Sequence, residues 1–140
     1  MSDIQKLREE HAVLVDIVGR LSKIVSAPSS PPIDELYNIR RELASTLIAH
    51  LKAEDLALYP RLMESGDPKI AATSKKFSDE MGGLAAAFGV YSMRWDAMSI
   101  EVNWNGFCSE TTDIAAALTA RITRENRELY PLIDRIDQAA

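Results

Sequence analysis

Two segments of the chain repeat one pattern of polar and aromatic residues. They read HLKAEDLALYP at residues 50–60 and RITRENRELYP at residues 121–131. In both segments a glutamate follows the first residue by four positions, and a Tyr-Pro pair ends the segment. The first residue is His50 in one copy and Arg121 in the other. One copy therefore begins with a potential metal ligand, and the other begins with a permanent cation.

The spacing of these residues favours a cluster of ionisable groups inside a helical protein. Residues four apart share one face of an α-helix, so His50 lies beside Glu54 and Arg121 beside Glu125. His11, the other of the two histidines in the chain, falls in an apolar seam. Ionisable groups buried in this way must pair, lose their charge or bind a metal ion. The alternative for Arg121 and Glu125 is an exposed ion pair, which would contribute little stability.

Three loop-forming stretches divide the chain into segments that must position these residues. They are SAPSSPPID at 26–34, ESGDP at 64–68 and EVNWNG at 101–106. The segments between them have the apolar spacing of helices, and none has the alternation of a strand. We predict one domain over residues 1–140, with helices at about 2–26, 33–64, 68–99 and 105–136. The fold class is all-α, as an antiparallel up-down-up-down four-helix bundle.

Single residues predict how these helices begin, bend and pack. Asp67 and Pro68 are typical of a helix start, and Pro60 predicts a kink in the second helix. Gly82 and Gly83 fall within the third helix, where each costs about 1 kcal/mol relative to alanine. We expect a close approach of another element, or space for a bulky side chain, to offset that cost. The predicted core seam of the third helix consists of Phe77, Met81, Leu84, Phe88, Tyr91, Trp95 and Met98.

The composition excludes several classes of partner and site. The net charge is −5 and the isoelectric point about 5.0, which predicts no nucleic-acid partner because no basic surface is available for phosphates. No apolar run approaches the roughly 18 residues of a membrane span, and the N-terminus is polar rather than signal-like. We therefore predict a cytoplasmic protein without a membrane partner. The single cysteine excludes an internal disulfide.

Taken in order along the chain, the motifs resemble a known family. A Glu-Glu-His run ends at His11, a His-x-x-x-Glu motif occupies residues 50–54, and Tyr59 and Tyr130 each precede a proline. Over essentially its full length, the chain resembles the hemerythrin-like (HHE cation-binding) domain family. The resemblance implies a four-helix bundle that holds two non-haem irons between its helices. We expect both tyrosines to donate hydrogen bonds at the end of the bundle.

The resemblance assigns roles to some residues and exposes two departures from the family pattern. His11 and His50 match metal ligands, and Glu54 and Glu125 match the shared carboxylates. Met81 and Arg121 stand where the family has histidines of the second iron. The resemblance therefore implies at most one metal ion, with Arg121 supplying the charge of the second metal. Two glutamates and one arginine sum to −1, so one protonated histidine would neutralise the site and one divalent ion would leave +1.

These observations favour one function and leave two others open. We predict a sensor or regulatory binding protein with one non-haem iron, manganese or zinc ion. Its ligand would be a small diatomic molecule or an anion, such as dioxygen or nitric oxide. The alternative is a metal-free module that signals through a protein partner and in which the Glu54, Glu125 and Arg121 network is structural. An enzyme is not expected, because neither a catalytic triad nor a phosphate-binding loop is present; oxygen activation is the third possibility.

Overall fold

The computed structural model describes residues 3–139, and every regular element among them is a helix. The all-α class is therefore confirmed, whereas the up-down-up-down order stays a prediction. The elements are α1 (Asp3–Val25), α2 (Ile33–Lys52), the π-helical segment η1 (Ala53–Leu58), α3 (Tyr59–Met63), α4 (Pro68–Met81), α5 (Leu84–Arg94), α6 (Ala97–Val102), α7 (Trp104–Arg124), the π-helical segment η2 (Glu125–Leu129) and α8 (Tyr130–Ala139).

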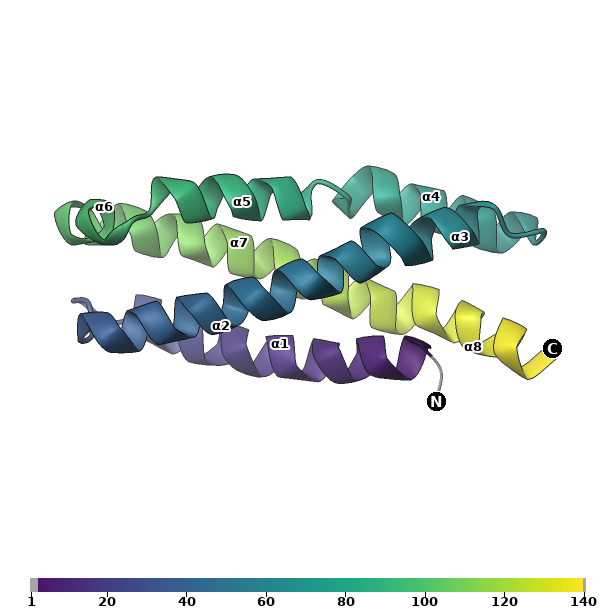
Figure 1. Ribbon diagram of the computed structural model, residues 1–140, viewed down its shortest axis with the longest axis horizontal. Coiled ribbons are helices and arrows are strands. Elements are labelled where there is room, and N and C mark those ends of the chain that lie inside the picture. The colour runs from purple at the N-terminus through teal and green to yellow at the C-terminus, as the bar shows by residue number, and fades with distance from the viewer. Residues whose placement is uncertain (1–2, 140) are drawn as a thin grey trace.

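The helices form an elongated bundle (Figure 1). Helix α1 packs against α2 and α7, α5 and α6 pack against α7, and α3 packs against α4. One end of the bundle carries α6 and the start of α2, and the other carries α3 and the start of α4 (Figure 1). None of the helices within residues 3–139 combines the length and apolar composition needed to cross a membrane.

Two helices continue through prolines by forming a π-helical turn before each one. Proline has no N–H to donate, so a regular α-helix loses one backbone hydrogen bond at this position. In η1 the Tyr59 N–H bonds to the Glu54 carbonyl, and in η2 the Tyr130 N–H bonds to the Glu125 carbonyl. Both bonds span five residues instead of four. The irregularity that we predicted at Pro60 takes the form of this π-turn, and such turns are frequent at functional sites.

The prediction of one continuous helix over residues 68–99 is wrong. The start is as expected, because the Asp67 side chain accepts from the N–H groups of Lys69 and Ile70. The helix then ends at Met81 and resumes at Leu84, so the two glycines form a turn rather than a helix interior. A Cβ atom at Gly82 would lie 2.4 Å from the Ser78 carbonyl oxygen, which makes glycine the only residue that fits without a shift.

A second break removes Met98 from the predicted core. The chain leaves the helix at Trp95, and Asp96 starts α6 by accepting from the Ser99 N–H at 2.8 Å. This change of direction shifts the helical face, so Met98 is 74% exposed and Ile100 is buried in its place. The prediction that Met98 belongs to the core is therefore wrong. It extended one helical period across Asp96, where a new helix begins.

Two apolar clusters fill the bundle and enclose a polar layer between them. The first contains Leu14, Leu47 and Leu118, with further residues that include some of α5 and α6. The second contains Leu7, Leu58 and Leu129, with further residues that include some of α4. On each of these three helical stretches the predicted ionisable residues lie between the two clusters. The ionisable layer is therefore covered by apolar side chains on both sides, which removes it from water.

The break at Gly82 generates a stability prediction with a matched control. Gly82→Ala should lower the free energy of unfolding by about 1–3 kcal/mol, because the new methyl group overlaps a backbone carbonyl. Gly83→Ala, where a Cβ meets nothing within 4 Å, should be neutral or stabilise by about 0.4–1 kcal/mol. Urea unfolding followed by circular dichroism measures both. Equal effects of the two substitutions would contradict the steric explanation.

Candidate metal centre

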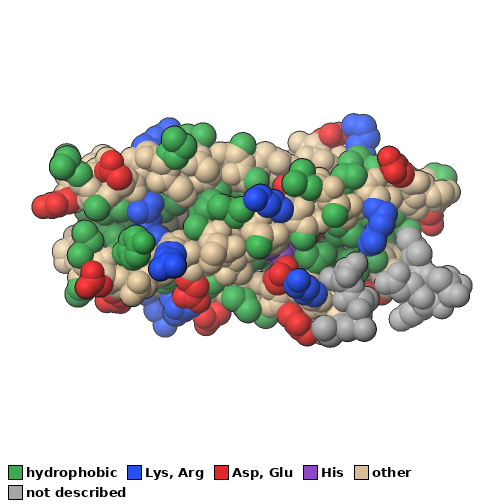
Figure 2. All heavy atoms as spheres, in the orientation of Figure 1, with side chains coloured by type: hydrophobic (Ala, Val, Ile, Leu, Met, Phe, Trp, Pro, Cys, Tyr) green, Lys and Arg blue, Asp and Glu red, His purple; other side chains and the backbone are tan. Residues whose placement is uncertain are grey.

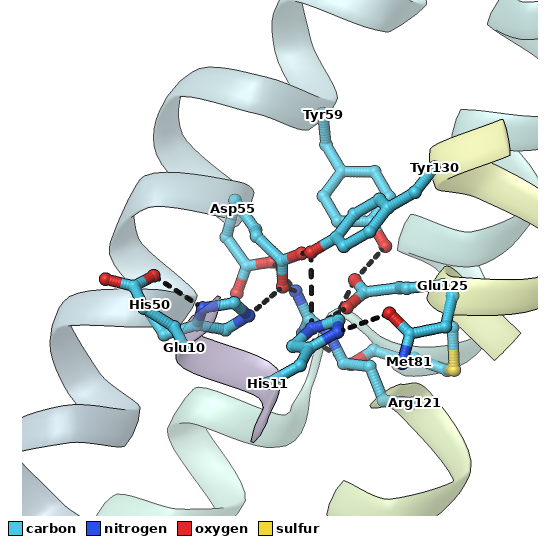
Figure 3. A network of polar contacts seen from close by, with 11 residues as sticks. Glu10, His11, His50, Asp55, Tyr59, Met81, Arg121, Glu125 and Tyr130 are labelled. Carbon is cyan, nitrogen blue, oxygen red and sulfur yellow. Dashed lines mark hydrogen bonds and ion pairs between the residues drawn. The ribbon is translucent and has the colours of Figure 1, made fainter. Parts of the chain in front are cut away.

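The structure brings all five predicted ionisable residues together in the buried layer. Glu54 and Glu125 are 0% exposed, His50 is 1% exposed, and His11 and Arg121 are 2% exposed. Figure 3 shows the side chains of His11, His50, Arg121 and Glu125 pointing toward one another. Arg121 and Glu125 therefore lie in the interior, and the alternative of an exposed ion pair is wrong. Whether these residues bind a metal ion stays a prediction.

Four of these side chains have the composition and spacing of a metal site. His11, His50, Glu54 and Glu125 each offer one ligand atom, and the four atoms all lie within 4.8 Å of one another. Two imidazoles with two carboxylates suit iron, manganese or zinc. The four residues come from α1, α2, η1 and η2, so the site exists only when the helices are packed.

Both histidines are oriented by a hydrogen bond at the outer ring nitrogen. His50 Nδ1 lies 2.8 Å from Oε1 of Glu10, and His11 Nδ1 lies 2.8 Å from Oδ1 of Asn126. A carboxylate only accepts, so His50 donates from Nδ1; His11 donates likewise to the amide oxygen. The inner nitrogen, Nε2, of each neutral ring then carries a lone pair. Such outer hydrogen bonds are the usual means by which proteins fix metal-binding histidines.

The inner nitrogens face carboxylate oxygens, an arrangement that a proton or a cation between them stabilises. His11 Nε2 lies 3.0 Å from Glu125 Oε1, and His50 Nε2 lies 3.2 Å from Glu54 Oε1. The buried Nε2 of His50 has no well-oriented hydrogen-bond partner. A lone pair facing a carboxylate is repulsive unless a proton or a cation separates the two. Burial disfavours the charged ring, but Glu54, Glu10 and Glu125 outweigh it and raise the pKa of His50.

Arg121 lies on the opposite side of the two glutamates and uses four of its five N–H groups. Nε donates to Glu125 at 3.2 Å, and Nη2 donates to Glu54 at 3.1 Å and to Asp55 at 2.6 Å. Nη1 donates to the backbone carbonyl of Met81 at 3.2 Å. Burial opposes the charge of the guanidinium, but Glu125 and the other carboxylates outweigh it and raise the pKa of Arg121. Arg121 is therefore a fixed cation in the site.

Met81 contacts the site through its backbone rather than its side chain. It is the last residue of α4, so its carbonyl has no partner within the helix and is free to accept from Arg121. Its side chain packs on the second apolar cluster. The glycines that follow Met81 therefore contribute a helix end. Of the two alternatives that we expected there, the structure shows the close approach of another element, because Arg121 reaches the Met81 carbonyl.

Each of the two tyrosines donates a hydrogen bond to the glutamate of the other repeated segment. Tyr59 follows Glu54 in the chain but donates to Glu125 at 2.5 Å, and Tyr130 follows Glu125 but donates to Glu54. Burial raises the pKa of both phenols, and the nearby carboxylates raise it further. Both hydroxyls therefore stay protonated. The expectation that the tyrosines donate hydrogen bonds is confirmed, and their acceptors are the two central carboxylates. Their hydroxyls lie in the buried layer rather than at the end of the bundle.

The charge of the site is more negative than the sequence predicted. Asp55 joins Glu54 and Glu125 around Arg121, and three carboxylates with one guanidinium sum to −2. Burial alone would raise the pKa of Glu54, but His50 and Arg121 lower it below its ordinary value. Burial and the neighbouring Glu54 raise the pKa of Glu125. One divalent ion with neutral histidines balances the charge of these four groups, and two protonated histidines do so without it. Glu10, which pairs with His50, lies outside this sum.

Three residues around the site were missed in the sequence. Asp55 and Asn126 each follow the glutamate of a repeated segment, so comparison of the two segments would have found them. The first contacts the arginine of the other segment, and the second contacts His11. Glu10 was visible only as part of the Glu-Glu-His run, and nothing in the sequence pairs it with His50.

Removal of the internal cation should destabilise the protein strongly. Arg121→Gln, measured in the presence of a chelator, should lower the free energy of unfolding by about 3–5 kcal/mol, because it leaves buried carboxylates unpaired. Arg127→Gln, on an exposed position of the same helical segment, should stay within about 0.5 kcal/mol of wild type. Denaturant unfolding measures both variants. A loss below about 1 kcal/mol for Arg121→Gln would show that the carboxylates are not ionised.

Comparison with known proteins agrees with these motifs. The model of the hemerythrin HHE cation-binding domain matches residues 2–133. Searches among curated proteins and among solved structures found no match. The matched range includes every residue of the buried layer, from His11 to Tyr130. The chain therefore belongs to the hemerythrin HHE cation-binding domain family.

Proposed function

We propose that this protein binds one divalent metal ion and acts as a sensor or regulatory binding protein for a small ligand. His11, His50, Glu54 and Glu125 hold the ion. The observation that carries the proposal is the orientation of both histidines. Their outer nitrogens are held by Glu10 and Asn126, and their inner nitrogens face carboxylate oxygens at 3.0–3.2 Å.

The charge of the site supports one ion rather than two. The groups around Arg121 sum to −2, which equals the charge that one divalent ion neutralises. Arg121 already supplies positive charge to both glutamates, so a second ion would meet repulsion at its expected position. When bound, an iron ion would supply a coordination position for a small ligand, and the protein residues would orient it and exclude water.

The burial of the layer supports a small ligand rather than an organic substrate. The two histidines, two glutamates, two tyrosines and Arg121 are each at most 2% exposed. A diatomic molecule or small anion needs little space, whereas an organic substrate would need these packed side chains to move. An oxygen-activating enzyme is therefore the weaker proposal.

A metal-free protein is the second candidate, and one observation favours it. Among the described residues, every polar side-chain atom of the layer except His50 Nε2 has a hydrogen-bond partner without a metal ion. Two protonated histidines would balance the charge as well as a divalent ion does. In that case the network stabilises the bundle, and the protein signals through a protein partner.

Metal quantitation separates the two candidates. Protein purified without chelators and reconstituted with Fe(II), Mn(II) or Zn(II) should contain about one equivalent of metal, and His50→Ala should lose it. Glu10→Gln should bind the metal about 10–100-fold more weakly, because the outer hydrogen bond to His50 is weakened. Glu9→Gln, at an exposed neighbouring position, is the matched control and should bind as wild type does.

The same measurement can reject the metal site. Less than about a tenth of an equivalent after reconstitution, with no change in stability on chelation, would favour the metal-free candidate. Equal affinities of Glu10→Gln and Glu9→Gln would contradict the proposed orienting role of Glu10.

Ligand binding tests the sensor role separately. Nitric oxide added without oxygen to the Fe(II)-loaded protein should produce a new absorption band that saturates at about one ligand per metal ion. The Zn(II)-loaded protein should give no such band, because zinc has no redox chemistry. A protein that holds Fe(II) but gives no spectral change would contradict the sensor role while leaving the metal site intact.

A further inference from the structure

A pocket lies at the end of the bundle that carries α6 and the start of α2, away from the candidate metal centre (Figure 1). It has a volume of about 870 Å³ and is lined by residues of the 28–40 and 92–104 stretches. This volume falls within the range of small-molecule sites, about 300–1,000 Å³. Arg40 of its lining precedes His50 by ten residues on α2, which corresponds to about 15 Å along the helix axis. The pocket is therefore separate from the buried polar layer.

The inner wall of the pocket is apolar and aromatic. Leu36, Trp95 and Ile100 are between 4% and 7% exposed, and Trp104 is half-buried. The indole N–H of Trp95 donates to Glu110 at 3.0 Å, and that of Trp104 donates to the Ala27 carbonyl at 3.2 Å. Because both N–H groups are already satisfied, the indoles offer only apolar ring surface to a ligand.

Exposed apolar residues surround the same pocket. Ile33 and Tyr37 of its lining are 64% and 62% exposed, and Met98 and Val102 of α6 are 74% and 81% exposed. Figure 2 shows hydrophobic side chains at the surface of this end of the molecule, where α6 and the start of α2 lie. Clustered exposed apolar residues mark binding surfaces more often than isolated ones do.

Arg40 is the only cation among the residues that line the pocket. Its side chain is half-buried, and its guanidinium carbon lies 5.5 Å from the centre of the Phe107 ring. Its polar neighbours are the Tyr91 hydroxyl and Asp96, whose pKa the positive charge of Arg40 helps to lower. No direct ion pair joins Arg40 to a carboxylate of the described residues. A half-buried guanidinium without a direct ion pair can bind an anion through two parallel hydrogen bonds.

The acidic residues of the lining limit the charge of that anion. Asp34, Asp96 and Glu101 are exposed at the pocket, and Asp96 already accepts from the Ser99 N–H. Exposed charges are screened over about 8 Å at physiological ionic strength, which weakens their repulsion of a single carboxylate. They would repel a ligand with several negative charges more strongly. The arrangement therefore favours a single anionic group on an apolar body.

We propose that this pocket binds an amphipathic monocarboxylate. The carboxylate pairs with Arg40, and the apolar chain or ring lies against Trp95, Trp104 and Ile100. This site is independent of the proposed metal ion, because none of its lining residues belongs to the buried polar layer.

The two tryptophans give a direct test, because they are the only ones in the chain and both line the pocket. Decanoate, titrated below its micelle concentration, should change the tryptophan emission with a saturable curve. Decanol and decyltrimethylammonium have the same chain length without the carboxylate, and we expect both to bind at least about tenfold more weakly. Equal or tighter binding of the cation would overturn the proposal, as would the absence of a saturable change with decanoate.

Variants test the role of Arg40. Arg40→Gln should weaken decanoate binding at least about tenfold and leave decanol binding unchanged. Arg41→Gln, at the adjacent exposed position of α2, should bind decanoate as wild type does. If circular dichroism shows that Arg40→Gln does not fold, Ala97→Phe fills the pocket from its exposed lining and should abolish the emission change. Wild-type affinity in a folded Arg40→Gln or Ala97→Phe variant would overturn the proposal.

Discussion

The structure depends on two glutamates that are buried between helices and whose charge must be offset without water. Glu54 and Glu125 are 0% exposed, and the cost of removing a carboxylate from water exceeds the stability that most single contacts supply. Four kinds of group offset this cost here: the Arg121 guanidinium, two tyrosine hydroxyls, two imidazoles, and the proton or metal ion that the imidazoles require. The contacts of Arg121 with Glu54, and of Tyr59 and His11 with Glu125, join different helices and form only when these are packed. The buried charge therefore ties helix pairing to the chemistry of the site.

Local departures from α-helical geometry position these groups. The π-turns at η1 and η2 each begin near a glutamate and end at a tyrosine, and each tyrosine then reaches the glutamate of the other segment. The turn at the glycines ends α4 at Met81 and frees a carbonyl for Arg121. A regular α-helix satisfies its own carbonyls, so this contact requires a helix that ends inside the bundle. The irregular backbone is therefore part of the site.

The spacing of residues predicted which side chains share a helical face, but it did not predict where the helices are interrupted. Periodicity placed His11, His50, Glu54, Arg121 and Glu125 in one interior, and the structure brings them together, because four-residue spacing fixes a helical face regardless of the partner helix. It extended the third helix through Gly82, because the apolar seam continues on the same side across that break. It failed at Met98, because the break after Trp95 changes the direction of the helix and shifts the face that turns inward. Asp55 was missed because helical spacing places it beside the seam, and only the long reach of Arg121 brings it into contact.

Both repeated segments can supply positive charge to the buried glutamates. The charge is permanent in one segment and exchangeable with solution in the other. An arginine is covalently part of the chain and stays protonated at physiological pH, so the positive charge at residue 121 cannot be exchanged with solution. A histidine at the equivalent position can gain a proton, lose it or bind a metal ion. The charge on the Arg121 side of the glutamates is therefore constant, and only the side of His11 and His50 can vary. If both sides of the glutamates were variable, an ion could be lost from either side. Because only one side is variable, any response of the buried layer to solution must pass through the two histidines.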